Sequence, residues 1–144
     1  MAGPTLRERA LRLLARREHA RAELARKLAG HAESEAELEA LLDDLCAHDL
    51  LSDERYAQMR LRSHGARLGN ARLERELLAA GVDGDLAAGV LSGADDEFSR
   101  AREVWRRKYA ARPADEAERA RQMNFLLRRG FSGETIRRVL RGED

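Results

Sequence analysis

The sequence is poor in the residues that build β-sheets, and it has no apolar run long enough for a membrane span. Aromatic residues make up only 4% of the 144 residues, and Val, Ile and Thr are scarce beside Ala, Leu, Arg and Glu. Local propensities therefore favour helices almost throughout, and we expect an all-α protein without a sheet. No apolar stretch reaches about 18 residues and no apolar region of a signal peptide is present, so we expect a cytoplasmic protein without a membrane partner.

The sequence also lacks the motifs of common enzymes and metal sites. It has no P-loop, no nucleophile elbow and no zinc-protease helix motif. Cys46 is the only cysteine, and we expect it to be a buried free thiol on the stripe of Leu38, Leu42 and Leu45. Because Cys46 and His48 are two residues apart on a predicted helix, their side chains point apart and do not form a metal pair. We expect no catalytic residue, no metal and no cofactor.

An internal repeat is the most informative pattern in the chain. The segment GVDGD at residues 81–85 returns 49 residues later as GFSGE at residues 130–134. Each copy predicts a helix that ends at a left-handed Gly, followed by Asp83 or Ser132 as the cap of the next helix. Repeats of this size are typical of helical arrays, which present a long surface to a partner. We predict an elongated array of three tandem three-helix repeats, at residues 1–51, 52–93 and 94–144.

Hydrophobic periodicity predicts nine helices and several of their ends. Ser34 and Ser52 are expected to cap helices, and Pro113 permits the start of the eighth. Trp105 and Tyr109 recur at helical spacing, so we expect them in the core rather than stacked on nucleic acid bases. The apolar stripe of the eighth helix is expected to contain Ala120, Met123, Leu126 and Leu127.

The formal net charge of +1 hides a segregation of charge along the chain. Residues 1–29 carry eight basic and three acidic side chains, whereas residues 30–54 carry nine acidic and no basic ones. Basic and acidic segments continue to alternate after residue 54. One explanation is that neighbouring helices of opposite sign attract each other. The other is a surface with separate positive and negative bands, which suits a partner of mixed charge such as a protein filament wound on DNA.

Three-helix units also occur in helix-turn-helix proteins, which read DNA directly. The predicted helix near residues 83–91 has no Arg, Lys, Asn or Gln that could read base edges. The last predicted helix offers Arg137, Arg138 and Arg141, which could contact phosphate but give little specificity. Sequence-specific DNA recognition is therefore disfavoured.

Three blocks of the chain match the pattern of a known family in the same order. The first block is ALRLLARREH at residues 10–19, followed by Glu23-Leu24 and Lys27-Leu28. The second is LLSDERYA at residues 50–57, followed by Gly69, Leu73, Glu76-Leu77 and Gly81. The third is Arg107-Lys108-Tyr109 with FLLRRGF at residues 125–131. In these blocks, which span about residues 6–141, the chain resembles the bacterial RecX proteins, regulators of the RecA recombinase.

Two positions depart from the pattern of that family. Ala20 stands where the family usually has Ser before the second helix, so the capping box with Glu23 is lost and the helix is expected to start less firmly. Asn70 stands where the family usually has Pro after Gly69, and Asn is itself an acceptable cap. Both departures are expected to affect local stability more than function.

The resemblance implies a protein that binds and regulates a partner. It implies a curved array of three-helix repeats that lies in the groove of the RecA filament on single-stranded DNA. Binding of this array is expected to lower strand exchange, ATP hydrolysis and repressor cleavage by RecA. It also implies no enzyme activity and no cofactor. We expect a monomer with at most weak direct contact to DNA. The alternative is a helical DNA-binding module that acts independently of RecA.

Basic side chains on the predicted helices are the candidate contacts to the filament or its DNA. Arg9, Arg12 and Arg16 recur at i, i+3 and i+7, so they share a face of the first helix that is largely distinct from its apolar stripe. A solvated charged face is the ordinary explanation for such a pattern. The candidate residues are Arg9, Arg12, Arg16, Arg17, Arg26, Lys27, Arg72, Arg75, Lys108, Arg128, Arg129, Arg137 and Arg138.

Overall fold

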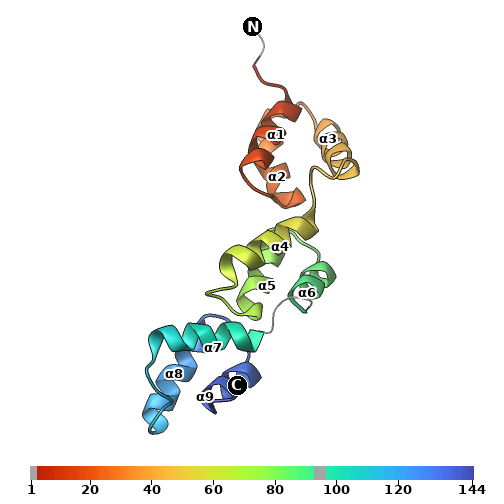
Figure 1. The fold of residues 1–144 in the computed structure, drawn as a ribbon. Coiled ribbons are helices and arrows are strands. Elements are labelled where there is room, and N and C mark those ends of the chain that lie inside the picture. Colours follow the sequence, from red (N-terminus) through yellow and green to blue (C-terminus); the bar gives the residue numbers. More distant parts are fainter. Residues whose placement is uncertain (1–2, 93–96) are drawn as a thin grey trace. The chain divides into compact units, whose positions relative to one another are not determined.

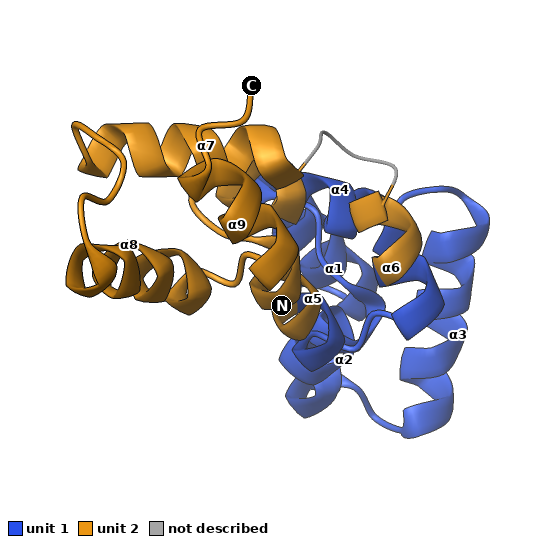
Figure 2. Cartoon of the chain, turned by 90° about the horizontal axis from the view of Figure 1, so that it is seen from below, with its two compact units in different colours: residues 1–59, 77–87 blue, residues 60–76, 88–144 orange. Residues whose placement is uncertain are grey.

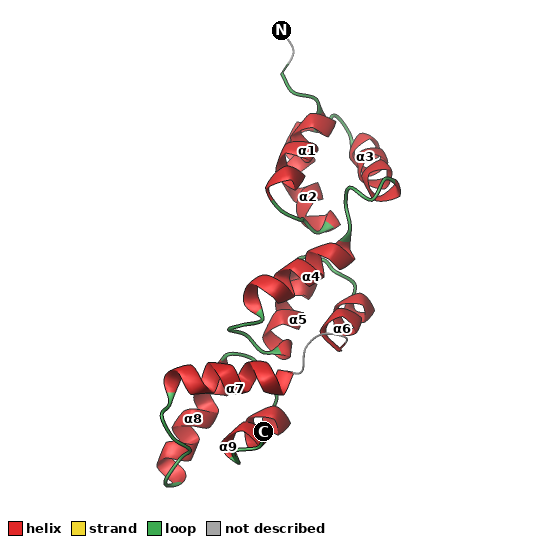
Figure 3. Cartoon of the chain, viewed as in Figure 1, coloured by secondary structure: helices red, strands yellow, loops and turns green. Residues whose placement is uncertain are grey.

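The structure is a computed structural model that describes residues 3–92 and 97–144. All regular structure in these residues is helical, so the all-α prediction is confirmed (Figure 3). The elements, labelled in Figure 1, are α1 (Leu6–Arg16), α2 (Arg21–Leu28), a short 3-10 helix η1 (Ala29–His31), α3 (Glu35–Ala47), α4 (Asp53–His64), α5 (Asn70–Ala79), α6 (Gly84–Ser92), α7 (Glu97–Lys108), α8 (Glu116–Arg128) and α9 (Gly133–Leu140). The predicted repeat boundary at residues 93 and 94 lies outside the described residues.

Buried positions recur with the repeat and fix its register. In the first helix of each repeat, Ala10, Ala57 and Ala101 are all 0% exposed. From the second helix onward, buried residues return at intervals of 49. The equivalent buried sets are Leu24, Leu73 and Gln122; Leu28, Leu77 and Leu126; Leu38, Ala87 and Ile136; and Leu42, Leu91 and Leu140. The repeats can therefore be compared residue by residue.

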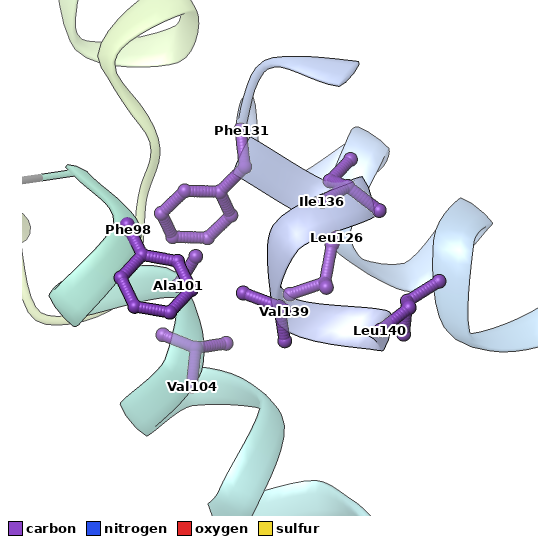
Figure 4. Packing of buried hydrophobic residues seen from close by; sticks show 8 residues of the cluster. All are labelled: Phe98, Ala101, Val104, Leu126, Phe131, Ile136, Val139 and Leu140. Atoms are coloured by element: carbon purple, nitrogen blue, oxygen red, sulfur yellow. The ribbon is translucent and has the colours of Figure 1, made fainter. Parts of the chain in front are cut away.

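The chain divides into two compact units, coloured separately in Figure 2. Unit 1 comprises residues 1–59 and 77–87, and unit 2 comprises residues 60–76 and 88–144. The core of unit 1 is largely leucine, from α1, α2 and α3. In unit 2, α7 and α8 both pack against α9. Figure 4 shows Phe98, Ala101 and Val104 of α7 facing Val139 of α9 across this core.

The turns after α5 and α8 have the predicted left-handed glycine. Gly81 and Gly130 have φ values of 91° and 92°. In each turn, the next backbone N–H donates to a buried leucine carbonyl, at 3.0 Å from Val82 to Leu77 and 3.3 Å from Phe131 to Leu126. A side chain at Gly130 would also collide with Arg72, so both the backbone conformation and the packing require glycine there.

The start of α2 is capped from a distant part of the chain. Ala20 provides no side-chain cap, as expected, but Glu23 Oε1 still accepts from the Ala20 N–H at 3.3 Å. Asp53 Oδ1 accepts from the Arg21 N–H at 2.7 Å. The weak helix start that Ala20 alone predicts is therefore offset by Asp53, which is 32 residues away in sequence.

The start of α5 uses the same device, which corrects the prediction that Asn70 is the cap. Asn70 is the first helical residue, and its N–H donates to Glu97 Oε2 at 2.8 Å. The N–H of Ala71 donates to the Gly130 carbonyl at 3.1 Å. Counting from Ala57 and Ala101, Asp53 and Glu97 are equivalent residues, each the first of its helix. Each therefore caps the second helix of the preceding repeat.

The eighth helix differs from its prediction in its start and its buried face. It begins after Asp115, whose carboxylate accepts from the Glu118 N–H at 2.8 Å, and Pro113 lies in the loop before it. Leu127 is 45% exposed and Ala120 is also exposed, whereas Gln122 is buried. The buried Gln122 side chain accepts from Trp105 Nε1 at 2.7 Å and donates to the Ala111 carbonyl.

Three other residues predicted in the core lie at its edge. Trp105 is half-buried and packs against the core of unit 2. Tyr109 is also half-buried, and its ring lies edge-on to Phe125 at 5.7 Å. Cys46 is half-buried rather than buried, with its Sγ atom 3.7 Å from Arg21 Nη1.

Candidate partner-binding hollows

Unit 1 contains a hollow of about 370 Å³ whose rim is basic, here called the first hollow. α1 supplies Arg9, Arg12 and Arg16 from the single face that the sequence predicted. α2 and η1 supply the opposite side. The full lining is Arg9, Arg12, Leu13, Arg16, Lys27, Leu28 and His31. Cations therefore surround a floor formed by two leucines.

A buried histidine holds Lys27 at this rim. His19 is 1% exposed, and its Nε2 atom lies 3.0 Å from Lys27 Nζ. Its Nδ1 atom lies 3.1 Å from the Arg17 carbonyl oxygen. Because an ammonium can only donate, Nε2 accepts from Lys27 and Nδ1–H donates to the carbonyl, which requires a neutral ring. Burial lowers the pKa of His19 and so favours this neutral form.

Arg17 is not among the residues that line the first hollow. Its guanidinium donates to both carboxylate oxygens of Glu23, at 2.6 and 3.1 Å. This hydrogen bonding raises the pKa of Arg17. The bidentate pair connects the end of α1 to α2, so the structure gives Arg17 a role within the fold.

Unit 2 contains a second hollow of about 200 Å³, again with four cations. It lies where α7 and α8 end, beside the loop that follows α4. The lining is Ala66, Arg67, Val104, Arg107, Lys108, Phe125 and Arg129. Lys108 and Arg129 were candidates from the sequence, whereas Arg67 and Arg107 were missed.

Two cations of the second hollow lie over the aromatic ring of Phe125. Lys108 Nζ lies 5.2 Å and the Arg129 guanidinium carbon 4.8 Å from the ring centroid, within the range of cation–π contacts. Arg129 also reaches the Arg67 carbonyl at 3.4 Å. Arg100 donates to the carbonyl of Leu68 at 2.6 Å, which fixes the loop that carries Arg67. Lys108 and Arg129 are thus placed by specific contacts, and the loop backbone at Arg67 is held by hydrogen bonds.

The remaining candidates lie outside both hollows. Arg72 donates to the Arg128 carbonyl at 3.1 Å, within unit 2. Arg138 pairs with Glu143 at 2.9 Å and lies 4.2 Å from the centre of the Phe98 ring. The candidates on exposed helix surfaces are Arg26, Arg75, Arg128 and Arg137.

Both explanations of the charge segregation have a structural counterpart. The acidic helix α3 attracts basic residues of unit 1, because Arg21 reaches Glu39 at 2.8 Å and Asp43 at 2.7 Å. The rim of the first hollow is different. In the described part of the chain, no ion pair joins Arg9, Arg12 or Arg16 to a carboxylate.

Across residues 3–92 and 97–144, no three His, Cys, Asp or Glu side chains gather where they could hold a metal ion. No helix in these ranges is long and apolar enough to cross a membrane. The fold and the two hollows define a helical repeat protein with basic hollows on its surface.

Comparisons with known proteins give the particular family. Family models described as the second and third three-helix domains of RecX match residues 52–91 and 95–140. A protein of Chromobacterium violaceum named Regulatory protein RecX is 49% identical over 97% of this chain and 91% of its own length. A protein of the same name from Leptothrix cholodnii is also 49% identical, over 97% of this chain and 90% of its length. The chain belongs to the RecX family of regulatory proteins.

Solved structures agree on the fold. The crystal structure of RecX from Lactobacillus salivarius aligns with a TM-score of 0.81 at 20% identity and covers 95% of this chain and 93% of that one. A second structure, titled as the crystal structure of regulatory protein RecX, aligns with a TM-score of 0.76 at 17% identity over 93% of this chain and 70% of that one. An all-α array of three-helix repeats is therefore common to these proteins.

Proposed function

We propose that this protein binds RecA filaments on single-stranded DNA and lowers their recombinase, ATPase and coprotease activities, and thereby regulates DNA repair. Its family supports a regulatory role, and RecA is the partner that the family implies. The observation that carries the proposal is the pair of hollows, each lined by Arg and Lys side chains, in a chain that belongs to this family. Guanidinium groups bind carboxylates through two parallel hydrogen bonds and so suit an acidic partner surface.

The two hollows suggest which candidate residues contribute most to filament binding. Arg9, Arg12, Arg16 and Lys27 line the first, and Lys108 and Arg129 line the second. We expect these residues to contribute more to filament binding than Arg17 or Arg138, because Arg17 and Arg138 pair with Glu23 and Glu143 at 2.6 and 2.9 Å, whereas Lys27 is 3.9 Å from Glu23. The protein would act as a monomer in the cytoplasm, without a cofactor or a reaction of its own.

A titration of RecA ATPase on single-stranded DNA tests the proposal. Increasing amounts of the full chain should lower the rate of ATP hydrolysis progressively, and the chain should cosediment with the filaments. A parallel titration of a DNA-independent ATPase controls for contamination and should show no change. Normal ATPase rates at saturating protein, with filaments intact, would contradict the proposal.

The alternative is a DNA-binding module that acts without RecA. Four cations around the second hollow would also serve a phosphate backbone. Binding to single-stranded and duplex DNA, measured across salt with and without RecA and nucleotide, separates the two. Full affinity for bare DNA with a steep salt dependence would favour the alternative, whereas binding that requires RecA would favour the filament.

A further inference from the structure

The two hollows occupy the same place in the first and third repeats. Leu13 and Val104 are each three residues after the buried alanine of their first helix, Ala10 and Ala101, and they line the two hollows. Arg16 and Arg107 follow three residues later and are also lining residues. The two hollows are therefore one structural feature, repeated.

In the middle repeat this place contains an ion pair. Arg60 is equivalent to Leu13 and Val104, because it is three residues after Ala57. Glu76 Oε2 accepts from Arg60 Nη2 at 3.1 Å and lies 3.3 Å from His64 Nδ1. Each of these side chains is less than 30% exposed. A carboxylate of the protein itself thus lies between the first and second helices of the middle repeat.

The flanking repeats lack this carboxylate. At intervals of 49 residues, Glu76 is equivalent to Lys27 and Phe125, which line the first and second hollows. In the described residues, no ion pair connects Arg67, Lys108 or Arg129 to a carboxylate, as for Arg9, Arg12 and Arg16 of α1. Arg107 pairs at 3.6 Å with Glu103 of its own helix, on an exposed surface.

We propose that the first and third repeats each bind an acidic side chain of a protein partner, in the place that Glu76 fills in the middle repeat. The proposal rests on the proposed function only for the partner being a protein. Leucine and phenylalanine walls favour this occupant, because a carboxylate on a hydrocarbon stem can contact them while its oxygens reach the cations. A phosphodiester, which is hydrated on all sides, gains little from apolar walls.

Two equivalent hollows also suit a partner built from identical subunits. Such a partner offers the same acidic residue more than once, so an occupant is present for each hollow. The middle repeat, with its internal Glu76, does not contribute a site.

Matched charge reversals test the two hollows. Arg16→Glu and Arg107→Glu each change one equivalent lining residue. Arg62→Glu and Arg106→Glu make the same change of charge on exposed residues of first helices outside the hollows. The probe is a short fluorescein-labelled oligoglutamate, measured by anisotropy with the full chain. We expect about a fivefold loss of affinity for each lining variant, a larger loss for the double variant, and less than about a twofold loss for each control.

A comparison with an oligothymidylate of matched charge identifies the occupant. Selective losses for oligoglutamate support a carboxylate in the hollows. Equal losses in lining and control variants would overturn the proposal, because only net charge would then matter. Losses confined to oligothymidylate would also overturn it and assign the hollows to phosphate. Circular dichroism of each variant must match the parent, and a lining variant that unfolds is replaced by Arg16→Gln or Arg107→Gln.

A third variant should act in the opposite direction. Glu76→Gln removes the carboxylate that fills the middle site but keeps a hydrogen-bond acceptor for Arg60. We expect affinity for oligoglutamate to rise about threefold, while Glu74→Gln, on the exposed surface of the same helix, changes it by less than about 1.5-fold. Equal gains for both variants would show that Glu76 does not block a site.

Filament binding is measured with the same variants to separate this inference from the proposed function. If the parent chain binds RecA filaments and the lining variants bind as well as the controls, the hollows are not the contact and the inference fails alone. If the parent chain does not bind filaments but the oligoglutamate results hold, the proposed function fails and the acidic-side-chain sites remain.

Discussion

Gly130 combines two requirements that no other residue type meets. Its φ of 92° disfavours a side chain, and a Cβ atom would collide with Arg72. Gly130→Ala should therefore lower the free energy of unfolding by more than about 1 kcal/mol. Gly89→Ala is the matched control, because Gly89 lies inside α6 with open space around its Cα. It should raise stability by about 0.5–1 kcal/mol. Urea unfolding of both variants measures the contrast, and a neutral Gly130→Ala would contradict the strained turn.

His19 should make stability depend on pH. Burial lowers its pKa below the value near 6.5 expected in the unfolded chain. Just below that value the unfolded state binds more protons than the folded state, so the free energy of unfolding falls as pH falls and levels off above it. His19→Gln should reduce the difference between urea midpoints at about pH 7.5 and about pH 5.5.

His31→Gln is the control for this measurement, because His31 is exposed. It should keep the pH dependence of the parent chain. If His19→Gln keeps that dependence as well, other groups cause it.

The sequence did not reveal which polar side chains are buried. His19 and Gln122 are each 1% exposed, although His and Gln commonly lie at the surface. Periodicity in apolar residues cannot identify them, since their burial depends on partners elsewhere in the chain. Gln122 was recoverable in principle, because it stands 49 residues after Leu73, in the repeat register.

At the scale of the helix, remote caps should contribute measurable stability. Asp53→Ala removes the acceptor for the Arg21 N–H and should lower the free energy of unfolding by about 1 kcal/mol. Glu54→Ala removes a neighbouring exposed acid from the same turn of α4 and should cost about half of that or less. Equal losses would mean that the effect comes from α4 and its dipole, not from the cap of α2.

The helices themselves were predictable because their signals are local. Ser34 and Ser52 accept from N–H groups three residues later, as the sequence indicated. Gly81 and Gly130 end their helices in the predicted conformation. The caps from Asp53 and Glu97 were not predictable in this way, since the donor and acceptor are brought together only by packing.

At the scale of the molecule, one substitution in each unit tests the register of the repeat. Leu77 and Leu126 are equivalent and at most 1% exposed, so Leu77→Ala and Leu126→Ala should each cost about 2–5 kcal/mol. Their neighbours Leu78 and Leu127 are both 45% exposed, and truncating these should cost less than about 0.5 kcal/mol. Denaturant unfolding compares the four variants. Similar costs within each pair of neighbours would contradict the register.

The candidate site was only partly predictable. The face of α1 follows from helical spacing, so three of its cations were found together. Arg67 lies in a loop and Arg107 at the end of α7, and their place with Phe125 in the lining of the second hollow depends on packing within unit 2. The sequence shows that one repeat position holds Lys27, Glu76 and Phe125 in the three repeats. Only the structure shows that Glu76 pairs with Arg60 at this position.

Because Asp53 and Glu97 cap helices of the preceding repeat, the order of synthesis determines when those helices are capped. A chain is synthesised from its N-terminus, so α2 lacks its acceptor until Asp53 has been added, and α5 lacks its acceptor until Glu97 has been added. In the third repeat, the second helix α8 carries its own cap, Asp115. Each repeat therefore completes the one made before it, and a nascent chain that stops before residue 97 leaves the first turn of α5 without its acceptor.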